Sequence, residues 1–80
     1  MSEADKLFKE LGYKKETYNP DVIYFTNIYI DTIYYAFNKN TKKFCFIENN
    51  EAGDISIQEL KAINLKCQEL GWIEWTNANI

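Results

Sequence analysis

The stretch Thr32-Ile33-Tyr34-Tyr35-Ala36-Phe37 decides the fold. Its side chains alternate between two faces with a period of two residues, which is typical of a β-strand that buries one face. Two further runs rich in aromatic and β-branched residues, Val22–Thr26 and Lys43–Glu48, flank it in the sequence. The polar residues 38–42, between Phe37 and Lys43, predict a hairpin loop. These residues therefore indicate a three-stranded antiparallel meander.

Helix signals stand before and after the strands. Ser2 is a helix cap and Gly12 a helix stop, with an apolar stripe between them. After the strands, Ser56 and Glu59 have the spacing of a capping box, and Gly71 ends a helix from about 57 to 70. Apolar residues mark one face of that second helix: Ile57, Leu60, Ile63, Cys67 and Leu70.

The expected fold class is therefore α+β, with the order helix, three-stranded antiparallel β-meander, helix (α-β-β-β-α). The 80 residues make a single domain, because compact domains are rarely shorter. We expect an ordered core over about 3–75 and frayed residues at 76–80.

The two faces of the sheet differ in their expected cover. Two short helices are enough to cover one face, which we expect to carry Ile23, Phe25, Ile33, Tyr35, Phe37, Phe44 and Phe46. The opposite face would carry Val22, Tyr24, Thr32, Tyr34, Ala36, Cys45 and Ile47. That face is unusually apolar for a solvated surface, so it is either a protein-binding face centred on Tyr24 and Tyr34 or a surface covered by Trp72-Ile73-Glu74-Trp75.

The connection Asn27-Ile28-Tyr29-Ile30-Asp31 carries large apolar residues where a loop is expected to be polar. The favoured explanation is that the strands extend beyond Val22–Thr26 and Thr32–Phe37 and include these residues. The alternative is an adhesive loop tip at Ile28, Tyr29 and Ile30.

Composition argues against catalysis, and we expect no enzyme activity and no cofactor. The chain has no His, which is the commonest general base, and both serines are explained as helix caps. Oxygen ligands at Glu48, Asn50, Glu51 and Asp54 do not have the spacing of a calcium loop, so we expect no metal site. No small-molecule substrate is evident.

Charge and cysteine content restrict the partners and the compartment. The net charge is −3, and lysines cluster only at the hairpin tip with Lys39, Lys42 and Lys43, so nucleic acid is not the expected ligand. Cys45 and Cys67 do not form a CxxC motif and are expected to be reduced. No signal peptide or membrane span is apparent, which favours the cytoplasm.

The segments Leu7-Phe8-Lys9-Glu10-Leu11-Gly12-Tyr13, Ile57-Gln58-Glu59-Leu60 and Glu69-Leu70-Gly71-Trp72 give the chain a family likeness. With the aromatic strands between them, it resembles small uncharacterised proteins of phages and prophages in low-GC Gram-positive bacteria. The resemblance implies a genomic setting and no activity or site residues.

The favoured function is a protein-interaction module that binds a host or phage protein through Tyr24 and Tyr34 or through Ile28, Tyr29 and Ile30. An alternative is a nucleic-acid-related role, either weak direct binding or the blocking of a nucleic-acid enzyme by acidic groups. Self-association as a structural homodimer is a third hypothesis.

Overall fold

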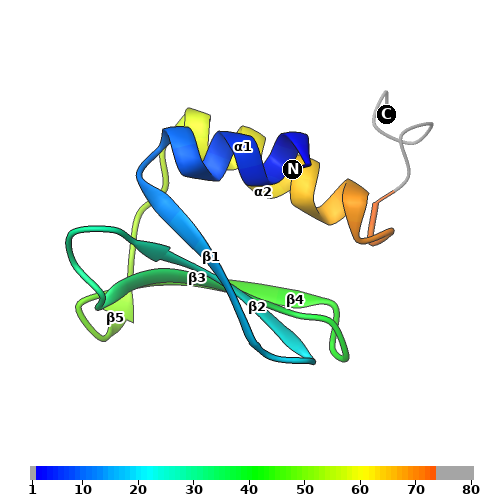
Figure 1. Ribbon diagram of the computed structural model, residues 1–80, viewed down its shortest axis with the longest axis horizontal. Helices are drawn as coiled ribbons and strands as arrows, with labels where there is room; N and C mark the ends of the chain where they lie inside the picture. The colour runs from blue at the N-terminus through cyan, green and yellow to red at the C-terminus, as the bar shows by residue number, and fades with distance from the viewer. Residues whose placement is uncertain (1, 74–80) are drawn as a thin grey trace.

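The computed structural model describes residues 2–73 and shows two helices lying on one side of an antiparallel sheet (Figure 1). The elements in chain order are α1 (Glu3–Glu10), β1 (Tyr13–Asn19), β2 (Val22–Asn27), β3 (Ile33–Asn38), β4 (Lys43–Glu48), β5 (Glu51–Ala52) and α2 (Ile57–Glu69). The sheet order β1-β2-β3-β4-β5 follows the chain, so each strand pairs with the next one. The α+β class, the flanking helices and the meander are confirmed, but the sheet has five strands and the predicted number of three is wrong.

The two strands missing from the prediction are the edge strands. β1 reads Tyr-Lys-Lys-Glu-Thr-Tyr-Asn and is mostly exposed, so it has no apolar alternation to reveal it. β5 follows Asn49 and Asn50, whose φ values of 53° and 68° form a tight left-handed turn. Asparagine tolerates this conformation better than most residues. Residues 49–52 therefore form the turn and the second strand of a short hairpin with β4.

The predicted helix ends are confirmed. In α2 the Ser56 hydroxyl accepts from the Glu59 N–H, and the Glu59 carboxylate accepts from the Ser56 N–H. At the other end, Gly71 has a φ of 78°, and the Trp72 N–H donates to the Cys67 carbonyl at 2.8 Å, as in a Schellman motif. These local contacts were readable from the sequence because they span at most five residues.

The predicted apolar face of α2 is partly wrong. Ile57 and Leu60 are 69% and 47% exposed, whereas Ala62, Ile63, Lys66 and Cys67 are buried. α1 packs beside α2, and its Asp5 lies 2.8 Å from the Lys66 ammonium, so the side of α2 that carries Lys66 is turned toward α1. The first turn of α2 is consequently left with apolar side chains in the open.

The core lies between the helices and the sheet. Phe8 from α1 stacks on Phe25 with a 4.0 Å centroid separation, and Tyr35 stacks on Phe46 at 4.4 Å. The expected helix-covered face is confirmed, except that Phe44 is exposed at the β4 side. Such aromatic packing buries a large area per residue, which a short chain needs.

No helix in the region 2–73 has the length and apolar character that a membrane span requires.

Candidate protein-binding site

A row of three tyrosines crosses the sheet face that points away from the helices. Tyr24 in β2 lies between Tyr18 of β1 and Tyr34 of β3. The rings of Tyr18 and Tyr24 are stacked, with centroids 5.2 Å apart and an interplanar angle of 8°. Tyr24 and Tyr34 are tilted to each other at 6.1 Å. The sequence indicated Tyr24 and Tyr34, but it missed Tyr18 because β1 itself was not predicted.

The apolar connection between β2 and β3 is a genuine loop. Tyr29 is 87% exposed, and Ile28 and Ile30 are 53% and 49% exposed. β2 ends at Asn27 and β3 begins at Ile33, so the favoured explanation that longer strands absorb these residues is wrong.

Hydrogen bonds hold this exposed loop in place. The Asn27 side-chain oxygen accepts from the N–H groups of Tyr29 and Ile30 at 2.9 and 3.0 Å. The Ile28 N–H donates to the Gly12 carbonyl at 2.9 Å, which ties the loop to the start of β1. The apolar side chains are therefore presented by a backbone that is already ordered, which lowers the entropic cost of binding through them.

The loop and the tyrosine row line one hollow, which we call the tyrosine hollow. Its volume is about 920 Å³, and it is open to solvent. It is lined by Tyr18, Tyr24, Tyr34, Ile28, Tyr29 and Ile30, together with Lys14, Glu16, Thr26, Asn27 and Asp31. The sequence offered the tyrosine face and the loop as separate candidates, and the structure places all five of those residues in this one hollow.

The alternative hypothesis, that Trp72-Ile73-Glu74-Trp75 covers the face with Tyr24 and Tyr34, is wrong for Trp72. Its ring lies 6.1 Å from that of Phe37, on the helix side of the sheet. Trp75 and the predicted frayed residues 76–80 lie outside the described residues. Tyr24 and Tyr34 are half-buried, and within residues 2–73 no helix or strand lies over the sheet face that points away from the helices (Figure 1).

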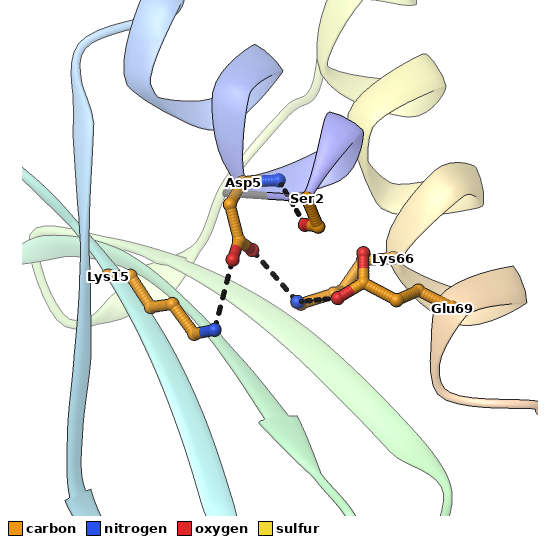
Figure 2. Close-up of polar contacts among 5 residues, drawn as sticks. All are labelled: Ser2, Asp5, Lys15, Lys66 and Glu69. Atoms are coloured by element: carbon orange, nitrogen blue, oxygen red, sulfur yellow. Dashed lines mark hydrogen bonds and ion pairs between the residues drawn. The ribbon is translucent and has the colours of Figure 1, made fainter.

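The three ion pairs found in residues 2–73 lie away from this hollow, around Asp5 and Lys66. Figure 2 shows Asp5 of α1 accepting from Lys15 and from Lys66, while Lys66 also donates to Glu69. The Lys66 side chain is 1% exposed, and its ammonium is 2.8 Å from Asp5. Burial alone would raise the pKa of Asp5, but the hydrogen bonds and positive charges of Lys66 and Lys15 outweigh it and lower that pKa.

A second polar cluster surrounds Glu59. Its carboxylate accepts from the hydroxyls of Tyr35 and Tyr13 as well as from the N–H of Ser56. Burial opposes ionisation of Glu59, yet these donors lower its pKa overall. Burial and the Glu59 charge raise the pKa of Tyr13 to about 12. Both clusters join helix to sheet, so their perturbed pKa values are explained by the fold.

The remaining candidate groups do not come together. Cys45 is exposed on β4 and Cys67 is buried on the helix side, and both are free thiols. Glu48, Asn50 and Glu51 belong to the β4–β5 hairpin, and no group of three potential metal-ligating side chains is found in the described part of the chain. Lys39 and Lys42 lie in the β3–β4 turn, away from the tyrosine hollow.

A second, smaller hollow of about 400 Å³ lies along α2. Exposed apolar side chains line it: Phe44, Ile57, Leu60 and Ile73 are among them. Its lining is more apolar than that of the tyrosine hollow, and it contains no tyrosine. Its residues therefore supply matched control substitutions.

Comparison of the chain with protein-family models, curated proteins and solved structures finds no significant match. Function is therefore inferred from the residues and their arrangement.

Proposed function

We propose that this protein is a small, non-enzymatic interaction domain that binds another protein through the tyrosine hollow. The observation that carries the proposal is the convergence of Tyr18, Tyr24 and Tyr34 with the exposed loop residues 28–30 in one concavity. The lining combines exposed apolar side chains with tyrosines, whose rings are apolar and whose hydroxyls are polar, and such amphipathic surfaces are typical of protein interfaces. Tyrosine is also enriched among the residues that dominate binding energy at protein interfaces.

Within residues 2–73, the polar side chains that could act in catalysis are engaged in contacts that stabilise the fold, which supports binding over catalysis. The sequence has no His, and the hydroxyls of Ser2 and Ser56 both accept backbone N–H groups at helix starts. The carboxylates with shifted pKa values, Asp5 and Glu59, line no part of the tyrosine hollow. The free thiols fit a reducing compartment, and we place the protein in the cytoplasm.

The charges around the hollow favour a protein over nucleic acid. Glu16 and Asp31 oppose Lys14 there, whereas a nucleic-acid surface needs a clear excess of positive charge. The resemblance to phage and prophage proteins identifies a lysate of a low-GC Gram-positive bacterium as the place to look for the partner.

The test is affinity capture of the tagged protein from such a lysate, with and without nuclease, read by mass spectrometry. The variant Tyr18→Ser/Tyr29→Ser changes two exposed side chains of the hollow, and Ile57→Ser/Leu60→Ser is the matched control on the α2 side. We expect a partner protein whose recovery resists nuclease, falls about tenfold or more in the tyrosine variant, and is unchanged in the control.

Three results would contradict the proposal. Recovery equal in wild type and the tyrosine variant would show that the hollow is not the binding surface. Recovery that vanishes with nuclease would favour the nucleic-acid alternative. Capture of nothing but the protein itself would favour self-association.

A further inference from the structure

The sheet has two edges, and they differ in what they offer. β5 is only two residues long, whereas β1 runs over seven residues from Tyr13 to Asn19. β1 pairs with β2 on one side, and no strand lies along its other side in residues 2–73. A free edge of this length is a template for one more strand, because its outward N–H and C=O groups remain available.

The register shows which backbone groups point outward. In antiparallel strands, successive residues turn their N–H and C=O groups alternately toward and away from the partner. The Ile28 N–H binds the Gly12 carbonyl, and Lys14 pairs with Thr26. The groups of Tyr13 and Lys15 therefore point away from β2, toward the free side.

A hollow lies on each side of this edge. On the open face, the tyrosine hollow reaches β1 at Lys14, Glu16 and Tyr18. On the helix face, a hollow of about 370 Å³ is lined by Tyr13, Lys15 and Lys9, with Asp5, Lys14 and Ile28. An added strand turns successive side chains to opposite faces, so its side chains would enter the two hollows alternately.

The charge on the helix side selects the partner. On the helix side, Lys9 and Lys15 lie around that hollow against the single carboxylate of Asp5, which binds both Lys15 and Lys66. Lys14 lines the same hollow from the other face of the edge strand and adds a third positive charge. Among the described residues, no ion pair engages Lys9 or Lys14. A second copy of this chain would bring its own β1 lysines to this edge, which is a like-charge arrangement.

We infer that β1 accepts an extended segment of the partner as a sixth strand, with acidic side chains toward the lysines and apolar side chains toward the tyrosine hollow. This inference rests on the proposed function and names the chemistry of the partner. Lysines on a free edge also deter unspecific pairing, which is compatible with the selection of an acidic strand.

The test uses two synthetic peptides, Glu-Val-Glu-Thr-Glu-Val-Glu and the same peptide with Lys in place of Glu. Amide hydrogen exchange of the full chain is followed by NMR during titration at low salt and at about 300 mM salt. We expect the acidic peptide to slow exchange at the Tyr13 and Lys15 amides about tenfold, and to bind about tenfold more tightly than the Lys peptide at low salt.

A pair of variants separates backbone pairing from charge. Lys15→Pro removes an outward N–H that β2 does not use, and proline is tolerated at such edge positions. Both variants lose the ion pair between the Lys15 ammonium and Asp5, but Lys15→Thr keeps the backbone N–H. The acidic peptide should bind Lys15→Thr and fail to bind Lys15→Pro, while the thermal unfolding midpoints of the two variants identify any general loss of structure.

Unchanged exchange at both amides with either peptide would overturn the inference, as would equal binding of the Lys peptide. Protection that appears without peptide and grows with protein concentration would assign the edge to a second copy instead. If the captured partner binds Lys15→Pro normally yet loses the tyrosine variant, the edge inference falls and the proposed function stands.

Discussion

Replacement of Asp5 by alanine is expected to destabilise the fold more than replacement of Lys66 by methionine. In Asp5→Ala the Lys66 ammonium stays buried, 2.9 Å from the partly exposed carboxylate of Glu69. Breaking a buried pair in this way costs about 3–5 kcal/mol, and the remaining contact with Glu69 reduces the expected loss to about 2–4 kcal/mol. In Lys66→Met the charge is removed together with its desolvation, while an apolar stem still packs near Phe25, so we expect a loss of about 0–2 kcal/mol.

The assay is chemical denaturation followed by circular dichroism, with the slope m checked for constancy. A loss of 2–4 kcal/mol corresponds to a fall of roughly 10–25 °C in Tm for a domain of this size. Glu51→Ala, which removes an exposed carboxylate, is the control and should change the free energy of unfolding by less than about 0.5 kcal/mol. The double variant Asp5→Ala/Lys66→Met should be more stable than Asp5→Ala alone. Equal losses in the two single variants, or losses that add in the double variant, would refute this reasoning.

Three further predictions concern pH, a hydrogen bond and a close approach. Because the fold lowers the pKa values of Asp5 and Glu59, their ionised forms stabilise it at pH values above their ordinary pKa values of 3.8 and 4.5. Denaturation midpoints should therefore fall as the pH drops through the lowered pKa values, and midpoints that do not change in acid would contradict this. Burial and the contact with Glu59 raise the pKa of Tyr35 from 10.0, so midpoints should also fall above about pH 10, and Tyr35→Phe should weaken that alkaline loss while costing about 1.5–3 kcal/mol at neutral pH. Gly53→Ala would place a Cβ 2.6 Å from the Phe46 ring, so calorimetry should show a loss of about 1–3 kcal/mol, and an unchanged Tm would contradict the contact.

The parts of the fold that the sequence predicts are those determined by local contacts. The capping box at Ser56 and Glu59 and the helix stops at Gly12 and Gly71 involve neighbouring residues, and the structure confirms them. The alternation in Ile33–Phe37 also predicts which face the helices cover, because a strand's period of two is independent of its partners.

The parts that escaped prediction depend on distant contacts. β1 becomes a strand because β2 pairs with it, although its own side chains are polar. Lys66 is buried because Asp5 meets it from 61 positions away along the chain, and no periodicity of α2 shows this. For the same reason the apolar stripe misplaced Ile57 and Leu60.

The candidate site was predictable in its residues but not in its assembly. Tyr24, Tyr34 and the residues Ile28, Tyr29 and Ile30 stand out from the sequence as apolar side chains on a second face and in a loop. Their convergence depends on the turn at Asn27 and on the bond from Ile28 to Gly12, which fold the loop against the start of β1. Tyr18 joins the site only through the unpredicted strand.

The most direct test of the tyrosine hollow as an interaction surface is photo-cross-linking from a single position. A benzophenone amino acid replaces Tyr29, which is 87% exposed at the hollow, or Ile57, which is 69% exposed on the α2 side. After irradiation in the bacterial lysate, our account predicts one discrete covalent adduct with a different protein from position 29 and none from position 57. An adduct from position 57 alone, or an adduct between two copies of this chain, would contradict it.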